Sequence, residues 1–205
     1  SKSSSRKTRP LQGKKAHFAR VAMITDWKVL CFIVIFFANT GQSLNSQASG
    51  NWHKANTAPV CFGASGTQFG SFYLPSGGGL VAIKLVHLFG YVSCDVSQPY
   101  HWSFWGCGQH VSVAQEVDVV ITTFDNKIIL PPGEFIKLSH QAGKWARVPG
   151  YNSVSKEIVL TPFTEPYPVL AGQQLRLWYG EDLQNSTEGD NGGRVCCDVY
   201  ALFQE

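Results

Sequence analysis

Residues 174–179, QLRLWY, and residues 194–203, RVCCDVYALF, are the stretch of sequence that decides the fold class. In both segments apolar and polar side chains alternate, which is typical of strands that bury one face against a core. Every second residue of a strand points to the same side, so the second segment has one apolar face, formed by Val195, Cys197, Val199, Ala201 and Phe203. The two segments therefore predict a sheet with one buried face and one wetter face.

Seven further short runs, apolar or rich in β-branched residues, precede this pair. They are separated by glycine, proline and polar turn residues, and they cover residues 68–74, 80–89, 111–124, 127–130, 134–138, 145–148 and 157–160. Residues 80–89 are also compatible with a buried helix, but their β-branched content favours a strand. Strands at this spacing predict an all-β sandwich or barrel. We expect an antiparallel, jelly-roll-like β-sandwich, disulfide-bonded and formed by a single domain over residues 59–205.

The composition supports a folded domain. The chain has 205 residues, of which 44% are hydrophobic and 15% are charged. This supplies enough apolar material for a core and excludes disorder along the whole chain. No apolar run reaches the roughly 18–20 residues that a membrane-spanning helix needs, so we expect no membrane span.

The first part of the chain predicts a processed leader. Residues 1–22 carry seven basic residues and no acidic residue, and the only methionine is Met23. After Met23 come one lysine, a ten-residue apolar run at 29–38 and then small residues. This is the layout of a secretory signal peptide over residues 23–43.

Cleavage fits after Ser43 or, as the competing choice, after Thr40, and residues 44–58 then form a flexible polar tail. We expect residues 1–22 to be an upstream segment absent from the mature protein, because a signal peptide must lie near the amino terminus. The alternatives are a basic arm that binds nucleic acid or anionic lipid and, last, a signal anchor. Removing residues 1–43 takes away eight of the 17 basic and one of the 14 acidic residues, which leaves a net charge of −4. A nucleic-acid partner therefore loses its support.

Five cysteines follow the predicted signal peptide: Cys61, Cys94, Cys107, Cys196 and Cys197. Secretion favours disulfides, and an odd number leaves one thiol free or paired with another chain. Cys197 lies on the apolar face of its strand, so we expect it to pair in the core with Cys94 or Cys107. Cys196 lies on the opposite face and is expected to pair with a peripheral segment such as Cys61.

Two further motifs concern metal binding and glycan attachment. The spacing of Cys107 and His110, with His101 nearby, is that of metal ligands, but no second pair completes a tetrahedral set. A disulfide cysteine beside ordinary histidines is therefore favoured over zinc. Asn185 begins an N-glycosylation sequon, Asn-Ser-Thr, in a polar stretch, so we expect a glycan on Asn185.

The polar segment 180–193 concentrates four carboxylates on what is expected to be one exposed loop: Glu181, Asp182, Glu188 and Asp190. Carboxylate and carbonyl oxygens are the ligands of Ca²⁺, and extracellular sites of this kind bind it with millimolar-range affinity. The favoured alternative is an acidic loop that is solvated and binds no ion. If an ion binds, these four side chains form a weak Ca²⁺ site.

The aromatic segment 100–107 contains Trp102 and Trp105, which are candidates for stacking on the sugar rings of a glycan. Large aromatic side chains are buried more often than exposed, so a core position is the favoured interpretation. No GxSxG, HExxH or P-loop motif is present, and no GxGxxG precedes a helix, so we expect no enzymatic activity. A secreted hydrolase whose site has no recognisable motif is ranked last.

The carboxy-terminal sequences QQLRLWYGEDL, at 173–183, and DNGGRVCCDVY, at 190–200, resemble secreted extracellular proteins of cnidarians, in particular the uncharacterised skeletal organic matrix proteins of stony corals. The resemblance covers mainly residues 150–205 and the secreted layout. It implies deposition in a calcifying matrix, in contact with calcium carbonate and other matrix components. The chain lacks the long aspartate runs of strongly mineral-binding matrix proteins, which favours a framework or adhesion role.

We therefore expect a secreted structural or binding component of an extracellular matrix, of the calcifying skeletal kind that the resemblance implies. The alternative is a lectin-like domain that binds glycans, with the weak Ca²⁺ site in the 180–193 loop.

Overall fold

A computed structural model of the chain describes residues 51–136, 143–162 and 164–204. These residues belong to a unit that runs from Ala48 to Glu205. The predicted basic segment, the predicted signal peptide and the first part of the predicted tail lie outside the described residues. No helix within the described ranges is both long enough and apolar enough to cross a membrane.

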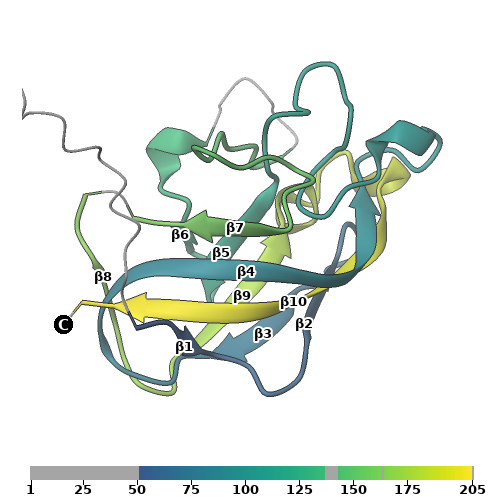
Figure 1. Cartoon of the computed structure of the whole chain (residues 1–205). Coiled ribbons are helices and arrows are strands. Elements are labelled where there is room, and N and C mark those ends of the chain that lie inside the picture. The colour runs from purple at the N-terminus through teal and green to yellow at the C-terminus, as the bar shows by residue number, and fades with distance from the viewer. Residues whose placement is uncertain (1–50, 137–142, 163, 205) are drawn as a thin grey trace, which may run out of the picture. The chain divides into compact units, whose positions relative to one another are not determined.

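Six strands form the first sheet: β1 (His53–Lys54), β2 (Val60–Gly63), β4 (Gly78–Ser93), β7 (Glu157–Leu160), β8 (Tyr167–Val169) and β10 (Gly192–Phe203). The main path of the sheet runs β1–β10–β4–β7, while β2 also pairs with β10 and β8 also pairs with β4 (Figure 1). All of these pairs are antiparallel. The long strands β4 and β10 lie side by side and form the centre of the sheet.

The second sheet has four strands, β3 (Gly70–Tyr73), β5 (Val119–Thr123), β6 (Ile128–Leu130) and β9 (Gln174–Tyr179), in the order β3–β9–β5–β6. Both sheets contribute buried side chains to one shared core. The first sheet supplies Ile83, Leu85, Val195 and Val199, and the second supplies Val119, Ile121, Leu175 and Leu177. The predicted antiparallel, disulfide-bonded all-β fold is therefore confirmed.

The strands with the clearest sequence patterns are also confirmed individually. Strands β7 and β9 have the predicted bounds, and β4 and β10 each begin two residues before the predicted run. In β10 the predicted apolar face is the one that enters the core. These segments are regular because their β-branched and aromatic side chains fit a pleated, half-buried surface.

Three of the predicted runs are wrong in part. Of residues 111–124 only 119–123 form a strand, because the preceding backbone closes local turns, such as Val113 N–H to the His110 carbonyl oxygen, instead of pairing with a strand. Residues 134–138, whose last two positions lie outside the described ranges, begin in the 3₁₀ helix η2 (Gly133–Phe135). Residues 145–148 do not form a strand, and Ala146 alone makes isolated β-bridges, with Val117 and with Ile136.

A β-bulge bends β4 near its carboxyl end. The register with β10 shifts between Cys196 and Cys197, which makes Leu88 the extra residue of β4. Gly90 follows with a φ of +85°, and a Cβ atom there would lie 2.2 Å from the carbonyl oxygen of Arg194. Only glycine fits this conformation and this close approach. The bulge therefore lets β4 stay paired with β10 as far as Ser93, where the candidate site begins.

The disulfides agree with one predicted pair and correct the other. Cys61 is bonded to Cys196 across β2 and β10, as predicted. The second disulfide is Cys94–Cys107, and Cys197 is a free, buried cysteine. The prediction that Cys197 pairs with Cys94 or Cys107 is wrong, because its side chain is enclosed between the sheets while the other two close a local loop.

Candidate functional site

Two loops that carry the predicted site residues meet at one end of the domain, where β4 ends and β10 begins (Figure 1). The first loop, residues 94–118, contains the 3₁₀ helix η1 (Pro99–His101). The second, residues 180–191, contains α2 (Gly180–Gln184) and the 3₁₀ helix η3 (Glu188–Asp190). The backbone N–H of Val96 in the first loop donates a 2.9 Å hydrogen bond to the carbonyl oxygen of Asp190 in the second.

Two glycines at the start of β10 allow the first loop to pack against the strand. A Cβ atom on Gly192 would lie 2.6 Å from Cγ1 of Val96, and a Cβ atom on Gly193 would lie 2.6 Å from Cζ3 of Trp102. Side chains do not approach one another that closely, so the indole of Trp102 covers a position that only glycine can occupy. The predicted aromatic candidate and the predicted acidic loop are therefore neighbours in space.

Asp182 and Glu188 bind the turn at residues 66–68. The two carboxylate oxygens of Asp182 accept hydrogen bonds from the backbone N–H groups of Thr67 (2.6 Å) and Gln68 (2.8 Å), and Glu188 Oε2 accepts one from Gly66 (3.0 Å). Burial raises the pKa of Asp182; these two backbone bonds lower it, and the adjacent Glu188 raises it. Two of the four predicted Ca²⁺ ligands thus lie side by side on a row of backbone donors.

Glu181 and Asn191 form the second polar pair. The amide Nδ2 of Asn191 donates to Glu181 Oε2 (2.7 Å) and to the carbonyl oxygen of Ala64 (3.2 Å). Burial raises the pKa of Glu181 to about 7; the Asn191 bond and a bond from Trp145 lower it, and the charge of Asp190 raises it. Asn191 is 8% exposed, and its Oδ1 is buried with no hydrogen-bond partner. This oxygen is a buried acceptor without a donor, directly after the four acidic residues of the segment 180–193.

Asp118 organises the start of α2, and sequence reasoning missed it. Its carboxylate accepts hydrogen bonds from the backbone N–H groups of Lys144 (2.5 Å) and Glu181 (3.0 Å), and its carbonyl oxygen accepts one from Gly180 (2.6 Å). Burial raises the pKa of Asp118 well above its usual range, and the charge of Glu181 raises it further, while the two backbone bonds lower it. The one available signal was a charged residue inside the apolar run 117–121.

The structure corrects the prediction of an exposed, solvated loop at 180–193. Glu181 and Asp182 are only 6% and 4% exposed, because the backbone N–H of Glu181 donates to the Asp118 carboxylate and this bond holds the start of α2 against the domain. Asn185 is exposed and ends α2 in the left-handed conformation, so the sequon is accessible and its glycosylation stays a prediction.

The four predicted Ca²⁺ ligands share one neighbourhood but divide into two pairs, Asp182 with Glu188 and Glu181 with Asp190. Within the described ranges, one group of three or more Cys, His, Asp or Glu side chains places its potential ligand atoms within 4.8 Å of one another, and it is a different group, formed by Cys94, His101 and Cys107.

The two tryptophan candidates have different positions. Trp105 is fully buried, its Nε1–H donates to the carbonyl oxygen of Ser155 (2.7 Å), and its ring stacks on Phe62. It is a core residue and cannot contact a glycan, which corrects its inclusion among the stacking candidates. Trp102 is 37% exposed and Tyr100, beside it in the chain, is 71% exposed. These two rings are the aromatic surface of the first loop.

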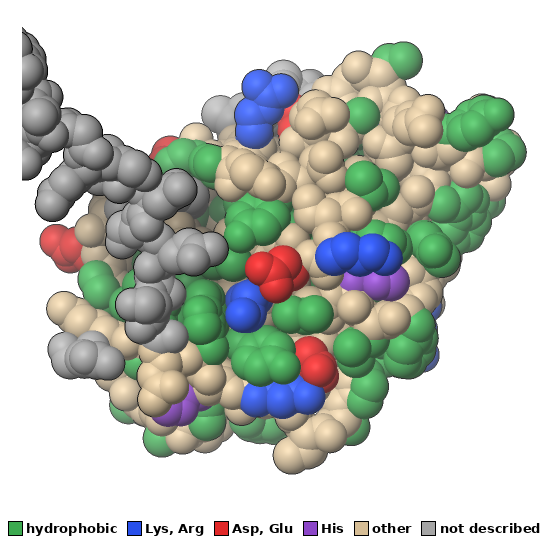
Figure 2. Space-filling view, viewed as in Figure 1, with side chains coloured by type: hydrophobic (Ala, Val, Ile, Leu, Met, Phe, Trp, Pro, Cys, Tyr) green, Lys and Arg blue, Asp and Glu red, His purple; other side chains and the backbone are tan. Residues whose placement is uncertain are grey.

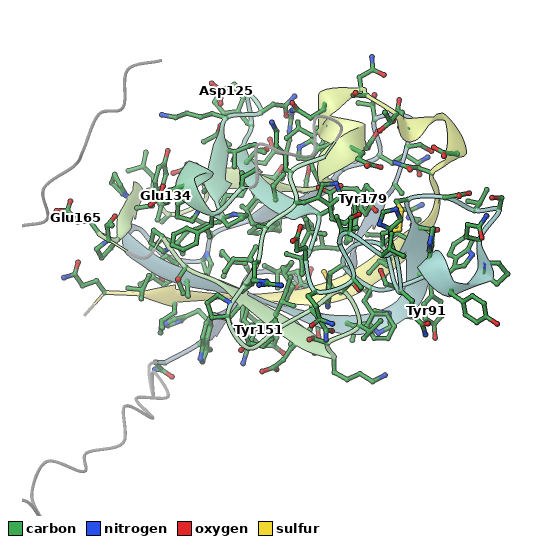
Figure 3. The ribbon with its side chains drawn as sticks, turned by 90° about the horizontal axis from the view of Figure 1, so that it is seen from above. Tyr91, Asp125, Glu134, Tyr151, Glu165 and Tyr179 are labelled. Atoms are coloured by element: carbon green, nitrogen blue, oxygen red, sulfur yellow. A yellow bond between two sulfur atoms is a disulfide. The ribbon has the colours of Figure 1, made fainter. Side chains whose placement is uncertain are left out.

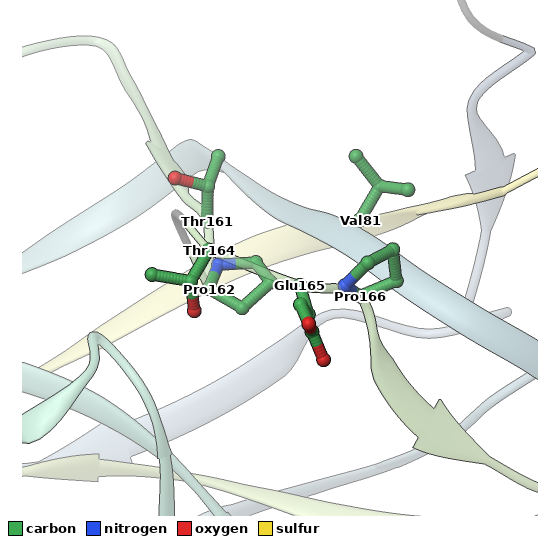
Figure 4. Close-up of a pocket in the computed structure, with 6 residues that line it drawn as sticks. All are labelled: Val81, Thr161, Pro162, Thr164, Glu165 and Pro166. Carbon is green, nitrogen blue, oxygen red and sulfur yellow. The ribbon is translucent and has the colours of Figure 1, made fainter.

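Two hollows of the described surface lie away from these residues. One, of about 300 Å³, is lined by Val81, Thr161, Pro162, Thr164, Glu165 and Pro166 (Figure 4). Figure 3 places Glu165 and Tyr91 near opposite ends of the described domain, and Tyr91 lies on β4 beside the candidate site. A second hollow, of about 310 Å³, is lined by Gln115 and residues 147–152. Neither contains a predicted site residue.

The outer face of the first sheet carries mixed charges. In the view of Figure 2, basic and acidic side chains alternate with apolar ones, and no large area of one sign is present on this face of the described residues. Lys54 is paired with Asp198 (2.8 Å), and the Lys84 ammonium lies between the rings of Trp52 (4.8 Å) and Tyr200 (5.2 Å). These cations are engaged within the fold.

No family model matches the chain, and no curated protein matches it. Among solved structures it is similar to AJLec from the sea anemone Anthopleura japonica, a lectin by its name, with 39% sequence identity and a TM-score of 0.65. The alignment covers 76% of this chain and 98% of the AJLec chain.

Proposed function

Because the chain belongs to the family of the sea anemone protein AJLec, we propose that it is a lectin, a secreted protein that binds glycans without reacting with them. The observation that carries this proposal is 39% identity over 98% of the AJLec chain. The two disulfides support an extracellular location, since disulfides persist in oxidising compartments.

The comparison favours this glycan-binding alternative over the skeletal-matrix role that the coral resemblance implied. The coral proteins of that resemblance and AJLec are both cnidarian, but AJLec is a lectin by name. A contribution to an extracellular matrix would then be exerted through the glycans of that matrix, and calcium carbonate need not be the partner.

We place the glycan site at the end of the domain where the loops 94–118 and 180–191 meet. Trp102 and Tyr100 provide exposed rings on which the apolar face of a sugar can stack. Asp190 is exposed in the second loop, its backbone is hydrogen-bonded to Val96 of the first loop, and its carboxylate can accept hydrogen bonds from sugar hydroxyl groups. The exposed aromatic rings can contact the apolar face of a sugar, and the carboxylate can bind its hydroxyl groups. Together they can hold both chemically different surfaces of the sugar.

We further propose that Ca²⁺ binds next to this surface, at Glu181, Asp190 and Asn191. The residues fit a hard cation, because the Asn191 Oδ1 is buried without a donor, the Asn191 amide is bonded to the Glu181 carboxylate through Nδ2, and the charge of Asp190 acts on Glu181. Bound Ca²⁺ would supply a positive charge that neutralises these carboxylates and can accept further oxygen ligands. Asp182 and Glu188 hold the 66–68 turn against this segment and so fix its position.

The test is a glycan array probed with the secreted protein, once in millimolar Ca²⁺ and once in chelator. We expect binding to one group of glycans that weakens at least about tenfold in Tyr100→Ala and Trp102→Ala. Tyr73→Ala is the matched control, because Tyr73 is equally a surface aromatic residue, 58% exposed, on β3 of the other sheet. An array without any bound glycan in either buffer would refute the lectin proposal, and binding that survives chelation would refute the role of Ca²⁺ alone.

A further inference from the structure

The loop that begins after β4 contains a side-chain cluster that glycan binding does not use. Cys94 and Cys107 are joined by a disulfide, and His101 lies between them in sequence, at the end of η1. A ring nitrogen of His101 and the two sulfur atoms all lie within 4.8 Å of one another. The Nδ1 atom of His101 is buried and has no hydrogen-bond partner. Since buried polar atoms are normally paired, this nitrogen requires an explanation.

Thiolate sulfur and imidazole nitrogen are the ligands that zinc prefers. In a tetrahedral zinc site, with metal–ligand bonds of about 2.0–2.3 Å, neighbouring ligand atoms are roughly 3.5–3.8 Å apart. The cluster is already close to that size, so the two sulfur atoms need only separate from their mutual bond to reach it. The sequence spacing of Cys107 and His110 suggested zinc but lacked a second pair of ligands; the fold supplies Cys94 and His101.

We propose that Cys94, His101 and Cys107 form a zinc site that the Cys94–Cys107 disulfide masks. A dithiol reductant attacks the sulfur of Cys94, which is the more exposed of the two cysteines, and then releases itself as a cyclic disulfide. The S–S bond of the protein takes up two electrons and two protons and becomes two thiols. Zinc then displaces both thiol protons and binds the two thiolates and the imidazole, and water takes the fourth position.

The other disulfide provides an internal comparison. Cys61 and Cys196 join two paired strands, and no histidine or carboxylate forms a three-membered ligand group with them in the described ranges. Reduction therefore exposes a ligand group with a histidine at one disulfide and only thiols at the other. His110 lies edge-on to His101, with ring centroids 5.1 Å apart, and is outside the proposed ligand set.

The experiment measures zinc and cobalt binding to the full chain before and after treatment with a dithiol. We expect one zinc per reduced chain, against a chromophoric competitor, and at least about tenfold weaker binding in the oxidised chain. Co²⁺ in the same site gives thiolate-to-metal charge-transfer absorption, whose intensity should correspond to two thiolates. His101→Gln should lower the zinc affinity of the reduced chain at least about tenfold, while His110→Gln should leave it unchanged.

A second pair of variants distinguishes zinc binding at this site from loss of folding and from zinc binding by the other thiols. The Cys61→Ala/Cys196→Ala chain should keep the site, and the Cys94→Ala/Cys107→Ala chain should lose it. His101→Gln keeps both disulfides, so its folding is verified in the oxidised state before reduction. Zinc binding that is equal in His101→Gln and in the unaltered reduced chain, or that persists in Cys94→Ala/Cys107→Ala, would overturn the proposal.

Discussion

The side-chain amide of Asn191 donates a 2.7 Å hydrogen bond to the carboxylate of Glu181, and so joins the residue before β10 to the first turn of α2. The same amide group donates to the carbonyl oxygen of Ala64. One buried side chain therefore holds three segments together, while its own oxygen has no donor.

Asn191→Ala should abolish the stabilisation of the domain by Ca²⁺. A ligand at ten times its dissociation constant adds about 1.4 kcal/mol, which raises the Tm of a domain of this size by about 3–6 °C. The variant lacks the Oδ1 atom and should show no such rise, although its Tm in chelator will also be lower. The measurement is thermal unfolding in millimolar Ca²⁺ and in chelator. Asn185→Gln, in the same segment but exposed, should keep the full shift, and an equal shift in Asn191→Ala would remove this residue from the proposed site.

Glu181→Gln should change how stability depends on pH in chelator. Burial raises the pKa of Glu181 to about 7 in the folded chain, against 4.5 for an unperturbed glutamate. The folded state therefore favours the protonated carboxyl group of Glu181. The stability that this preference contributes is fully present below about pH 4.5 and is lost as the pH rises through about 7. Urea unfolding between pH 4.5 and 8 should show a fall in the free energy of unfolding that is smaller in Glu181→Gln. The pKa values of Asp118 and Asp182 are raised as well, so these two groups will leave a residual slope. Identical slopes in both chains would contradict the assignment.

Gly90→Ala should destabilise the domain by at least about 2 kcal/mol, because a non-glycine residue at positive φ is strained and its Cβ atom would collide with the backbone of Arg194. Gly133→Ala is the matched control, since a Cβ atom on Gly133 has no neighbour within 4 Å and its φ is not positive. Urea unfolding of the two variants gives the comparison. Equal stabilities would mean that β4 does not need the bulge for its pairing with β10.

Removal of Cys61–Cys196 should cost more stability than removal of Cys94–Cys107. The first disulfide joins residues 135 positions apart and the second joins residues 13 positions apart. In the chain-entropy model the long loop contributes about 4–5 kcal/mol and the short one about 3 kcal/mol. Urea unfolding of the two paired Cys→Ala variants tests the order, which the model requires even if strain alters the magnitudes. The reverse order would show that the short disulfide stabilises chiefly through native contacts.

The sequence predicts the parts of this fold in which a local pattern determines the structure. Alternating side chains were enough to locate β9 and to orient β10, and the orientation of β10 in turn identified the partner of Cys196. Local patterns do not contain contacts between distant segments. Asp118 lies 63 positions from Glu181, and the hydrogen bond that its carboxylate accepts from the Glu181 N–H holds an apparently polar segment in a helix whose first turn is buried.

The absence of long-range contacts from local patterns also explains why the sequence predicted the candidate site only in part. Trp102 and Trp105 are three positions apart and have similar sequence surroundings, yet one faces solvent and the other fills the core. The Trp102 indole packs against Gly193, a residue far along the chain whose missing side chain leaves room for the ring. Likewise, the pairing of Cys94 with Cys107 depends on how the loop after β4 closes, and the alternation of polar and apolar residues does not predict that closure.

Strand β10 runs from the candidate site to the opposite end of its sheet. It begins directly after Asn191 and pairs near its far end with β1, where His53 lies opposite Ala201. Ten residues of extended chain span about 33 Å, so β1 lies roughly that far from the surface proposed to hold sugars. A support attached next to β1 would therefore leave that surface facing outward. Immobilisation on this side should present the site to cell-surface or polymeric glycans without shielding it.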